Sequence, residues 1–144
     1  MEFLTLTPAS LTPALQEQIR ALFTQLNAEL RQLDAARVLA APNPPSILVC
    51  LEGDRLVGMG TVCFYDVISG RKAWIEDVVV DQAARGQGLG RAIMEKLIEI
   101  ASEKQAGEVL LFTGHHRTAA INLYRSLGFE EKQSKLLRLI LKRT

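Results

Sequence analysis

Two adjacent carboxylates, Glu76 and Asp77, interrupt an otherwise apolar segment between Ala73 and Val80. Such a short apolar run is typical of a buried strand, and a carboxylate is expensive to bury unless it is paired or has a function. Because side chains alternate along a strand, Glu76 is expected to share a face with Val78 and Val80, while Asp77 projects to the opposite face. Glu76 is therefore a candidate base or cation-binding group, and the alternative is a paired carboxylate at a solvated edge.

A glycine-rich turn follows this segment, with the sequence Arg85-Gly86-Gln87-Gly88-Leu89-Gly90, and a helix is expected to begin near Gly88. The first amides of a helix lack internal acceptors and the helix dipole adds positive potential there, so such a turn binds a phosphate or pyrophosphate well. The turn lacks the Lys-Ser/Thr ending of a nucleotide-triphosphate loop and the three-glycine spacing of the dinucleotide fingerprint. The alternative is a tight strand-to-helix turn that holds no ligand.

The glycine-rich turn resembles the Arg/Gln-x-x-Gly-x-Gly/Ala loop of the GNAT superfamily of acetyltransferases, which holds the pyrophosphate of acetyl-CoA. A second segment, Ala120-Ile121-Asn122-Leu123-Tyr124-Arg125-Ser126-Leu127-Gly128-Phe129, resembles the superfamily's Ala-x-x-x-Tyr-x-x-x-Gly-Phe helix. The two motifs occur in the family's order, and the resemblance covers about residues 47–141. It departs from the family at Arg117, where many members carry an Asn that contacts the cofactor. Arg117 is a candidate to reach a phosphate of coenzyme A instead.

The resemblance implies that acetyl-CoA enters a splayed notch between the strands at residues 75–80 and 109–113. Backbone amides near Val78 to Val80 are then expected to pair with pantetheine and to donate to the thioester oxygen as it gains charge. The expected cofactor-binding residues are Val78, Val79, Val80, Arg85, Gly86, Gln87, Gly88, Leu89, Gly90 and Arg117.

Glu76 and Tyr124 are the expected catalytic residues. An attacking amine must be neutral, so a nearby base helps to remove its proton. The run Ile75-Glu76-Asp77 resembles that of the polyamine and glucosamine-phosphate acetyltransferases, and in the polyamine enzymes the Glu serves as base or amine-binding carboxylate. Tyr124 matches the family's Tyr, which donates to the coenzyme A sulfur. The alternative for Tyr124 is a helix side chain packed on the core.

The remaining reactive side chains suggest neither a metal site nor a covalent intermediate. His115 and His116 are adjacent in a loop with no third ligand at metal spacing, so no metal is expected, and whether they contact substrate stays open. Cys50 and Cys63 lie in apolar strand-like segments and are expected to be buried free thiols. The resemblance then implies direct attack by the amine, without an acyl-enzyme.

The acceptor is expected to be a primary amine on a small molecule. A protein acceptor, either a lysine or an N-terminal amine, is the rival hypothesis, and a loop expected at residues 66–72 would decide it. A third hypothesis is a non-catalytic sensor that binds coenzyme A. Tyr65 and Trp74 belong either to the core or to the amine pocket.

The composition favours one ordinary globular domain over residues 1–144. Apolar residues make up 48% of the 144-residue chain and charged residues 23%. The net charge of +1, from 17 basic and 16 acidic residues, gives no support to nucleic-acid binding. No apolar run reaches the length of a membrane span and no signal peptide is evident, so a cytoplasmic location without membrane attachment is expected.

The order of elements predicts an α/β fold, with a mixed, strongly bent sheet of about six or seven strands and helices on both faces. Strands are expected at residues 2–7, 47–51, 56–65, 73–80, 109–113 and 136–141. Helices are expected from Pro13 to about Leu26, over 28–40, from about Gly88, and over 118–126. The final strand either pairs across a homodimer or completes the sheet.

Overall fold

The computed structural model describes residues 1–114 and 116–142, which form two compact units. The first unit comprises Met1–Phe112, and the second begins at Thr113. All the strands of the described chain belong to the first unit, whereas the second contains helix α4 (Thr118–Ser126).

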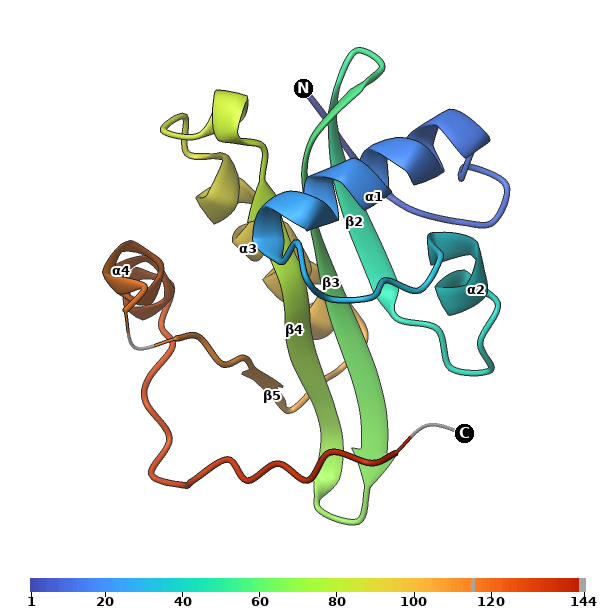
Figure 1. Ribbon diagram of the computed structural model, residues 1–144. Coiled ribbons are helices and arrows are strands. Elements are labelled where there is room, and N and C mark those ends of the chain that lie inside the picture. Colours follow the sequence, from blue (N-terminus) through green and yellow to red (C-terminus); the bar gives the residue numbers. More distant parts are fainter. Residues whose placement is uncertain (115, 143–144) are drawn as a thin grey trace. The chain divides into compact units, whose positions relative to one another are not determined.

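The first unit is built on one mixed sheet, with the strand order β1-β2-β3-β4-β5 (Figure 1). Neighbouring strands from β1 to β4 are antiparallel, and β4 and β5 are parallel. The strands are β1 (Glu2–Thr5), β2 (Ser46–Glu52), β3 (Arg55–Val67), β4 (Gly70–Val80) and β5 (Glu108–Leu110). The predicted mixed α/β class is confirmed, but the described chain has five strands rather than six or seven.

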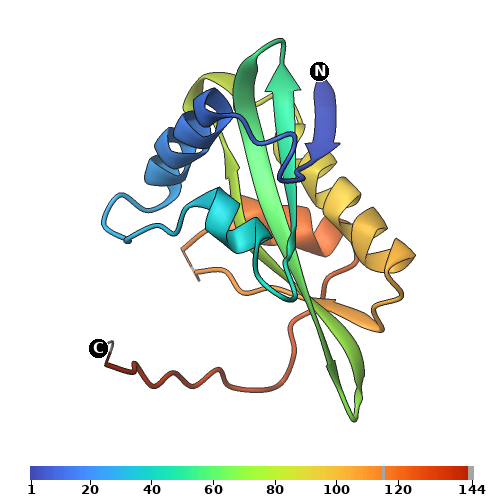
Figure 2. The same ribbon diagram turned by 90° about the vertical axis from the view of Figure 1, so that its right-hand side faces the viewer.

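Helices lie on both faces of this sheet, as predicted. Helices α1 (Pro13–Leu26) and α2 (Ala35–Leu39) cover one face, and α3 (Leu89–Glu103) covers the other (Figures 1 and 2). The start of α1 is as expected, because the Thr12 hydroxyl accepts a hydrogen bond from the Leu15 amide at 3.1 Å. In the described part of the chain, no helix is long and apolar enough to cross a membrane.

The core has two layers, one on each side of the sheet. On the α1 side, Leu15, Ile19 and Leu22 pack with apolar residues of β2, β3 and β4. On the α3 side, Ile93 and Leu97 are completely buried. Together these layers pack β3 and β4 between α1 and α3. The candidate carboxylates lie on β4.

The helix predicted over residues 28–40 is much shorter in the structure, where only Ala35–Leu39 is helical. Helix α1 ends at Leu26. The next residue, Asn27, caps the helix, and its side-chain oxygen accepts a hydrogen bond from the Glu29 amide at 3.1 Å. This local side-chain contact offers the backbone an alternative to a helical turn. Residues 28–34 therefore form a loop between α1 and α2.

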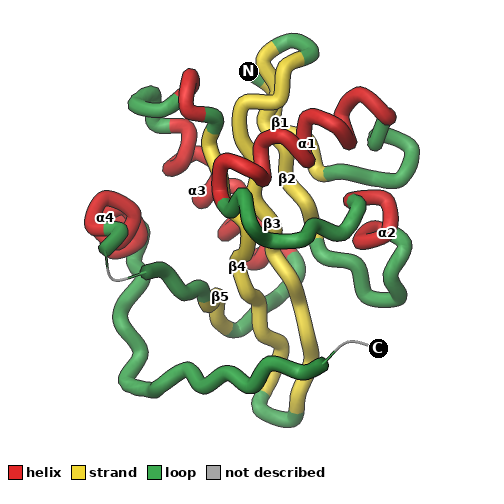
Figure 3. Tube along the Cα trace, viewed as in Figure 1, coloured by secondary structure: helices red, strands yellow, loops and turns green. Residues whose placement is uncertain are grey.

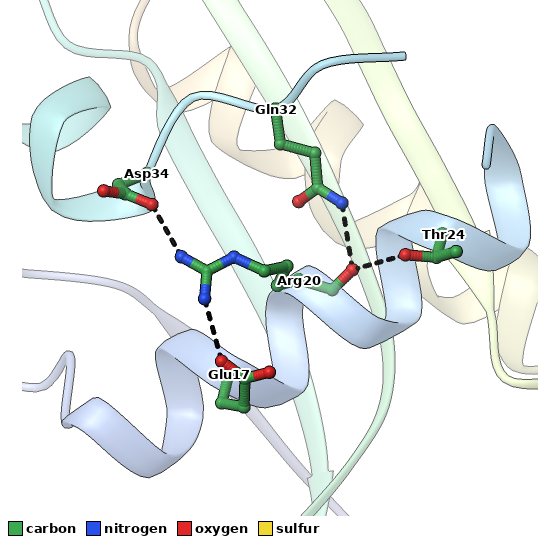
Figure 4. Close-up of polar contacts among 5 residues, drawn as sticks. All are labelled: Glu17, Arg20, Thr24, Gln32 and Asp34. Carbon is green, nitrogen blue, oxygen red and sulfur yellow. Dashed lines mark hydrogen bonds and ion pairs between the residues drawn. The ribbon is translucent and has the colours of Figure 1, made fainter. Parts of the chain in front are cut away.

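A cluster of polar contacts around Arg20 holds this loop against α1 (Figure 4). The Arg20 guanidinium donates to Asp34 at 2.7 Å and to Glu17 at 2.8 Å. The Arg20 carbonyl accepts from the side chains of Thr24 and Gln32, both at 3.0 Å. The arginine thus joins α1 to the residue before α2, although its exposed ion pairs contribute little to stability.

The polar loop predicted over residues 66–72 is instead the end of a long hairpin. Strand β3 continues to Val67 and β4 starts at Gly70, so only Ile68 and Ser69 turn the chain. Asp66 and Arg71 form an ion pair at 2.8 Å across this end. This end of the hairpin extends beyond the core, so residues 65–70 are exposed to solvent. An exposed polar segment of this kind has the composition of a loop.

The second unit confirms one predicted element and contradicts another. Helix α4 has the predicted bounds, Thr118–Ser126. The strand predicted over residues 136–141 is wrong, because no strand follows β5 in the described chain (Figure 3). Leucines at 136, 137, 139 and 141 and Ile140 are all exposed. An apolar alternation alone does not make a strand, since its backbone also needs a pairing partner.

The close packing of α3 on β3 depends on the absence of a side chain at Gly60. A Cβ atom there would lie 2.8 Å from Leu97 Cδ1 and 3.2 Å from Ile93 Cγ2, and both partners are fully buried. We therefore expect Gly60→Ala to destabilise the protein by about 1–3 kcal/mol, the usual cost of overpacking. Thermal unfolding measures this loss.

The matched control is Gly107→Ala, whose Cβ would meet its nearest neighbour at an ordinary 3.6 Å. The control should unfold within about 0.5 kcal/mol of the wild type, as surface substitutions usually do. Equal melting temperatures for the two variants would contradict the proposed role of Gly60 in helix packing.

Candidate active site

A bulge in β4 places the two candidate carboxylates. Met59 pairs with Val79 but Thr61 pairs with Glu76, so two residues of β4, Asp77 and Val78, lie opposite the single residue Gly60. Asp77 has a φ of 54°, in the left-handed region. Aspartate is one of the few non-glycine residues that tolerate this conformation. A bulge of this kind redirects side chains and bends its strand.

The bulge overturns the expectation that Glu76 and Val78 share a face. Residues directly opposite each other in an antiparallel pair project to the same face, so Glu76 lies on the face of Thr61. A Cβ atom at Gly60 would lie 3.3 Å from Val78 Cγ2 and 2.8 Å from Leu97 Cδ1, which places Val78 on the α3 face. The extra residue has reversed the alternation on which the prediction depended.

Both carboxylates titrate above their ordinary range. Partial burial raises the pKa of Glu76, and the negative charge of Asp77 raises it further. Desolvation also raises the pKa of Asp77, although this residue keeps an exposed surface. A carboxylate with a raised pKa is a stronger base and gains more from a nearby cation than a solvated one. The pair therefore suits the binding of an ammonium group and the removal of its proton.

The predicted splay between β4 and β5 is present. Strand β5 pairs with β4 only at Lys72, Ala73 and Trp74. Beyond Trp74, the described chain provides no strand partner for residues 75–80 on this side of β4 (Figure 3). Unpaired backbone N–H and C=O groups of a strand edge are a ready template for pairing with an extended ligand.

The open edge of β4 leads directly into the glycine-rich turn. A short 3-10 helix, η1 (Gln82–Ala84), precedes the turn, and α3 begins at Leu89. Gly86 and Gly88 have φ values of 81° and 76°, so both adopt the left-handed conformation that glycine permits. Gly88 caps α3 without a side-chain hydrogen bond, and no acidic residue lies in the first turn. The helix therefore presents its amides and positive dipole end with no internal anion.

Three residues that sequence reasoning missed hold the base of this turn. Gln25 of α1 donates to an Asp81 carboxylate oxygen and accepts from the Gln82 amide, both at 3.0 Å. Arg55 pairs with the other Asp81 oxygen at 2.6 Å. The hydrogen bond from Gln25 contributes most to lowering the pKa of Asp81, and the hydrogen bond from Arg55 lowers it further. No sequence signal connects Gln25 to a residue so distant in the chain, because only the packing of α1 on the sheet brings them together.

Arg85 also stabilises the turn from within. Its Nε atom donates to the carbonyl of Val80 at 3.1 Å. This contact links the end of β4 to the start of the turn. Arg85 therefore has a structural contact in addition to the cofactor contact that the sequence predicts.

The other predicted site residues lie in the second unit. Tyr124 lies on α4, and its ring makes an edge contact with Phe129 at 6.0 Å between centroids. Arg117 occupies the N-cap of α4 without a side-chain capping bond. His116 is exposed in the turn before α4, whereas His115 lies outside the described residues. The family resemblance remains the basis for assigning roles to Tyr124 and Arg117.

The cysteines differ from each other. Cys50 is completely buried, as predicted, but Cys63 is only partly buried. Burial raises the pKa of the Cys63 thiol, and the charges of Glu76 and Asp77 raise it further. A raised pKa disfavours the reactive thiolate. Among the described residues, no group of three or more His, Cys, Asp or Glu side chains is arranged to hold a metal ion.

The open edge of β4 and the glycine turn both lie within a segment of the chain that matches a known protein family. Residues 11–129 match the Acetyltransferase (GNAT) family. The chain belongs to this family. A solved structure of a putative acetyltransferase from Agrobacterium tumefaciens is 30% identical, covers 99% of this chain and 100% of its own, and superposes with a TM-score of 0.76.

Two further GNAT comparisons bear on sequence and on fold. Thialysine N-epsilon-acetyltransferase of Bos taurus is 33% identical over 97 residues, which are 67% of this chain and 54% of that protein. The chain spans about half the length of the curated relatives it matches first. An aminoglycoside acetyltransferase from an uncultured soil metagenomic sample has the same fold, with a TM-score of 0.82 and 23% identity over 98% of this chain and 96% of its own.

The raised pKa of Glu76 predicts that this GNAT site costs stability at neutral pH. The protonated carboxyl is favoured in the folded state, so the contribution of Glu76 to stability is present below the ordinary carboxyl pKa and is lost as the pH rises through the higher folded value. We expect Glu76→Gln to be more stable than the wild type at pH 7 by up to about 1 kcal/mol, because solvent screens part of the effect.

Thermal unfolding between pH 4 and pH 8 tests this expectation. The difference should shrink toward pH 4, where both proteins carry a neutral side chain at this position. Glu103→Gln, at an exposed position on α3, is the matched control and should show no such gain. A Glu76→Gln variant less stable than the wild type at pH 7 would contradict the expectation.

Proposed function

We propose that this GNAT protein is an N-acetyltransferase that transfers the acetyl group of acetyl-CoA to a primary amine of a small molecule. The observation that carries the proposal is the open edge of β4 at residues 75–80, which runs directly into the turn at residues 85–90. An extended ligand that pairs with the edge brings its phosphates to the start of α3. The two units then act together as one acetyltransferase domain.

The cofactor residues follow from this arrangement. Backbone groups of Val78, Val79 and Val80 pair with the pantetheine arm. The amides of the turn, from Arg85 to Gly90, receive the pyrophosphate. Arg117 contributes a cation from the second unit. When bound, acetyl-CoA supplies the activated acyl group, and the protein supplies position, hydrogen-bond donors and proton transfer.

Two side chains of the chain move protons in the proposed reaction. Glu76 accepts a proton from the bound ammonium group, which leaves a neutral amine to attack the thioester carbonyl carbon. The new C–N bond forms as the C–S bond breaks, and Tyr124 protonates the departing thiolate. The acylated nitrogen then loses its second proton, which restores the Tyr124 hydroxyl, and a neutral amide and a free thiol are left. The raised pKa of the Cys63 thiol is consistent with direct attack rather than an acyl-cysteine.

The acceptor is proposed to be a small amine on two grounds. The paired carboxylates Glu76 and Asp77 have raised pKa values and gain from a bound cation. The similar Bos taurus protein is named for acetylation of thialysine, an amino acid with a terminal amine.

A thiol-release assay with acetyl-CoA tests the proposal against polyamines, amino sugars, amino acids, aminoglycosides and short peptides. We expect turnover on a small amine, with kcat/KM rising with pH through a pKa above the ordinary Glu value. Glu76→Gln and Tyr124→Phe should each lower kcat by roughly 100-fold or more, the usual contribution of proton transfer. Cofactor binding, measured by calorimetry, should survive in both variants. Turnover only on peptides would overturn the small-molecule acceptor, and no binding of acetyl-CoA would overturn the proposal.

The left-handed turn predicts a second effect, on cofactor affinity. Gly88→Ala places a Cβ atom at a φ of 76°, where space is available but the backbone is strained by about 1–2 kcal/mol. We expect the turn to relieve this strain in the free protein by moving its amides, so that acetyl-CoA binding must restore the strained geometry and weakens by roughly 5- to 30-fold. Calorimetry compares this variant with Gly107→Ala, which lies away from the turn and should bind as the wild type does. Equal affinities would contradict the expectation that cofactor binding depends on the left-handed geometry of the turn.

A further inference from the structure

An aromatic group lies on the same sheet face as Glu76. Trp74 precedes Glu76 by two residues on β4, before the bulge, so the two side chains project to one face. Tyr65 of β3 lies on this face as well, because it follows Thr61 at an even spacing and Thr61 pairs with Glu76. Phe112 follows β5 and belongs to the same compact unit.

Direct contacts hold these three side chains together, and we call them the aromatic wall. The Trp74 indole N–H donates to the Tyr65 hydroxyl at 3.2 Å. The Trp74 and Phe112 rings meet edge to face with centroids 6.2 Å apart. Phe112 is 66% exposed and Tyr65 is 37% exposed. The wall is therefore ordered by its own contacts, yet it presents aromatic surface beyond the core.

The charges beside the wall favour a cation. Glu76 lies at one end of it, and partial burial and the charge of the neighbouring Asp77 raise the pKa of this carboxyl. At the other end, Lys72, which lies opposite Tyr65, forms an ion pair with Glu108 at 3.6 Å. An aromatic face attracts an ammonium group through its quadrupole, most strongly when the ring is that of Trp.

We propose that the aromatic wall is the acceptor-specificity site and selects a linear diamine, whose reacting nitrogen lies at Glu76 while its second ammonium group lies against Trp74. This proposal rests on the acetyltransferase function proposed above and deepens it. Residues two apart in a strand are separated by about 7 Å. The backbone of two extended residues crosses that distance with about six covalent bonds. An extended diamine with six bonds between its two nitrogens has five carbons, so the preferred diamine has about five carbons between its nitrogens.

The first test compares kcat/KM for α,ω-diamines of three to eight carbons with the corresponding monoamines. We expect a maximum near five carbons, with the diamine exceeding pentylamine by roughly 3- to 30-fold, the range of a cation against an aromatic face. Trp74→Leu should lower this ratio toward one, whereas Trp74→Phe, which keeps a ring, should retain most of it. A Trp74→Leu variant with an unchanged ratio would overturn the proposal, as would equal turnover of diamines and monoamines.

The matched control is Ile68→Ala. Ile68 is a fully exposed apolar residue at the β3–β4 turn, outside the aromatic wall. Its removal should leave the diamine-to-monoamine ratio unchanged. A loss of the ratio in this variant equal to that in Trp74→Leu would show that the effect is not specific to the wall.

A second test needs no acetyl transfer, because Trp74 is the only tryptophan in the chain. Titration of the full chain with 1,5-diaminopentane should produce a saturable change in tryptophan emission, with weaker binding for pentylamine and for the Glu76→Gln variant. Saturation without turnover on any amine would count against the acetyltransferase proposal alone. Turnover of amines without a diamine preference, or identical titrations with diamine and monoamine, would overturn the aromatic wall as a diamine site.

Discussion

The extra residue in β4 is the constraint on which the rest of the site depends. Asp77 adopts a left-handed conformation opposite Gly60, so β4 changes its alternation between Glu76 and Val78. Before the bulge, the strand directs Glu76 and Trp74 to one face. The pairing of β4 with β5 already ends at Trp74, and beyond the bulge β4 runs with an unpaired edge toward the glycine turn. One backbone irregularity thus separates the proposed acceptor side of the strand from its proposed cofactor side.

Packing on both faces of the sheet holds this irregular strand in place. On one face, α3 approaches β3 so closely that Gly58 and Gly60 have no room for a side chain. On the other face, α1 contributes Gln25, which bonds to both Asp81 and Gln82 at the base of the turn. The turn that is proposed to bind pyrophosphate is therefore preorganised by side-chain contacts from α1, an arrangement that lowers the entropic cost of binding.

The site also shows a conflict between stability and function. Burial and the charge of the neighbouring Asp77 raise the pKa of Glu76, so the ionised carboxylate costs folding free energy, and the left-handed conformation of Asp77 adds backbone strain. Such features are retained where chemistry needs them and are compensated elsewhere. Here the compensation comes from the fully buried residues of α3 and from the apolar face of α1. An amine bound between Glu76 and the aromatic wall would relieve the electrostatic part of this cost.

The sequence by itself determined the mixed α/β class, helices α1, α3 and α4 and the position of the glycine turn, because these depend on local periodicity, capping and glycine chemistry. It also made Glu76 a candidate site residue, since a carboxylate in an apolar strand is unusual. Only the tertiary structure decided on which face of the sheet Glu76 lies relative to Val78, because one bulged residue reverses an alternation that the sequence presents as regular. The contact of Gln25 with Asp81, the clustering of Tyr65, Trp74 and Phe112, and the absence of a strand at residues 136–141 likewise depend on which distant segments pair, and no local pattern encodes that choice.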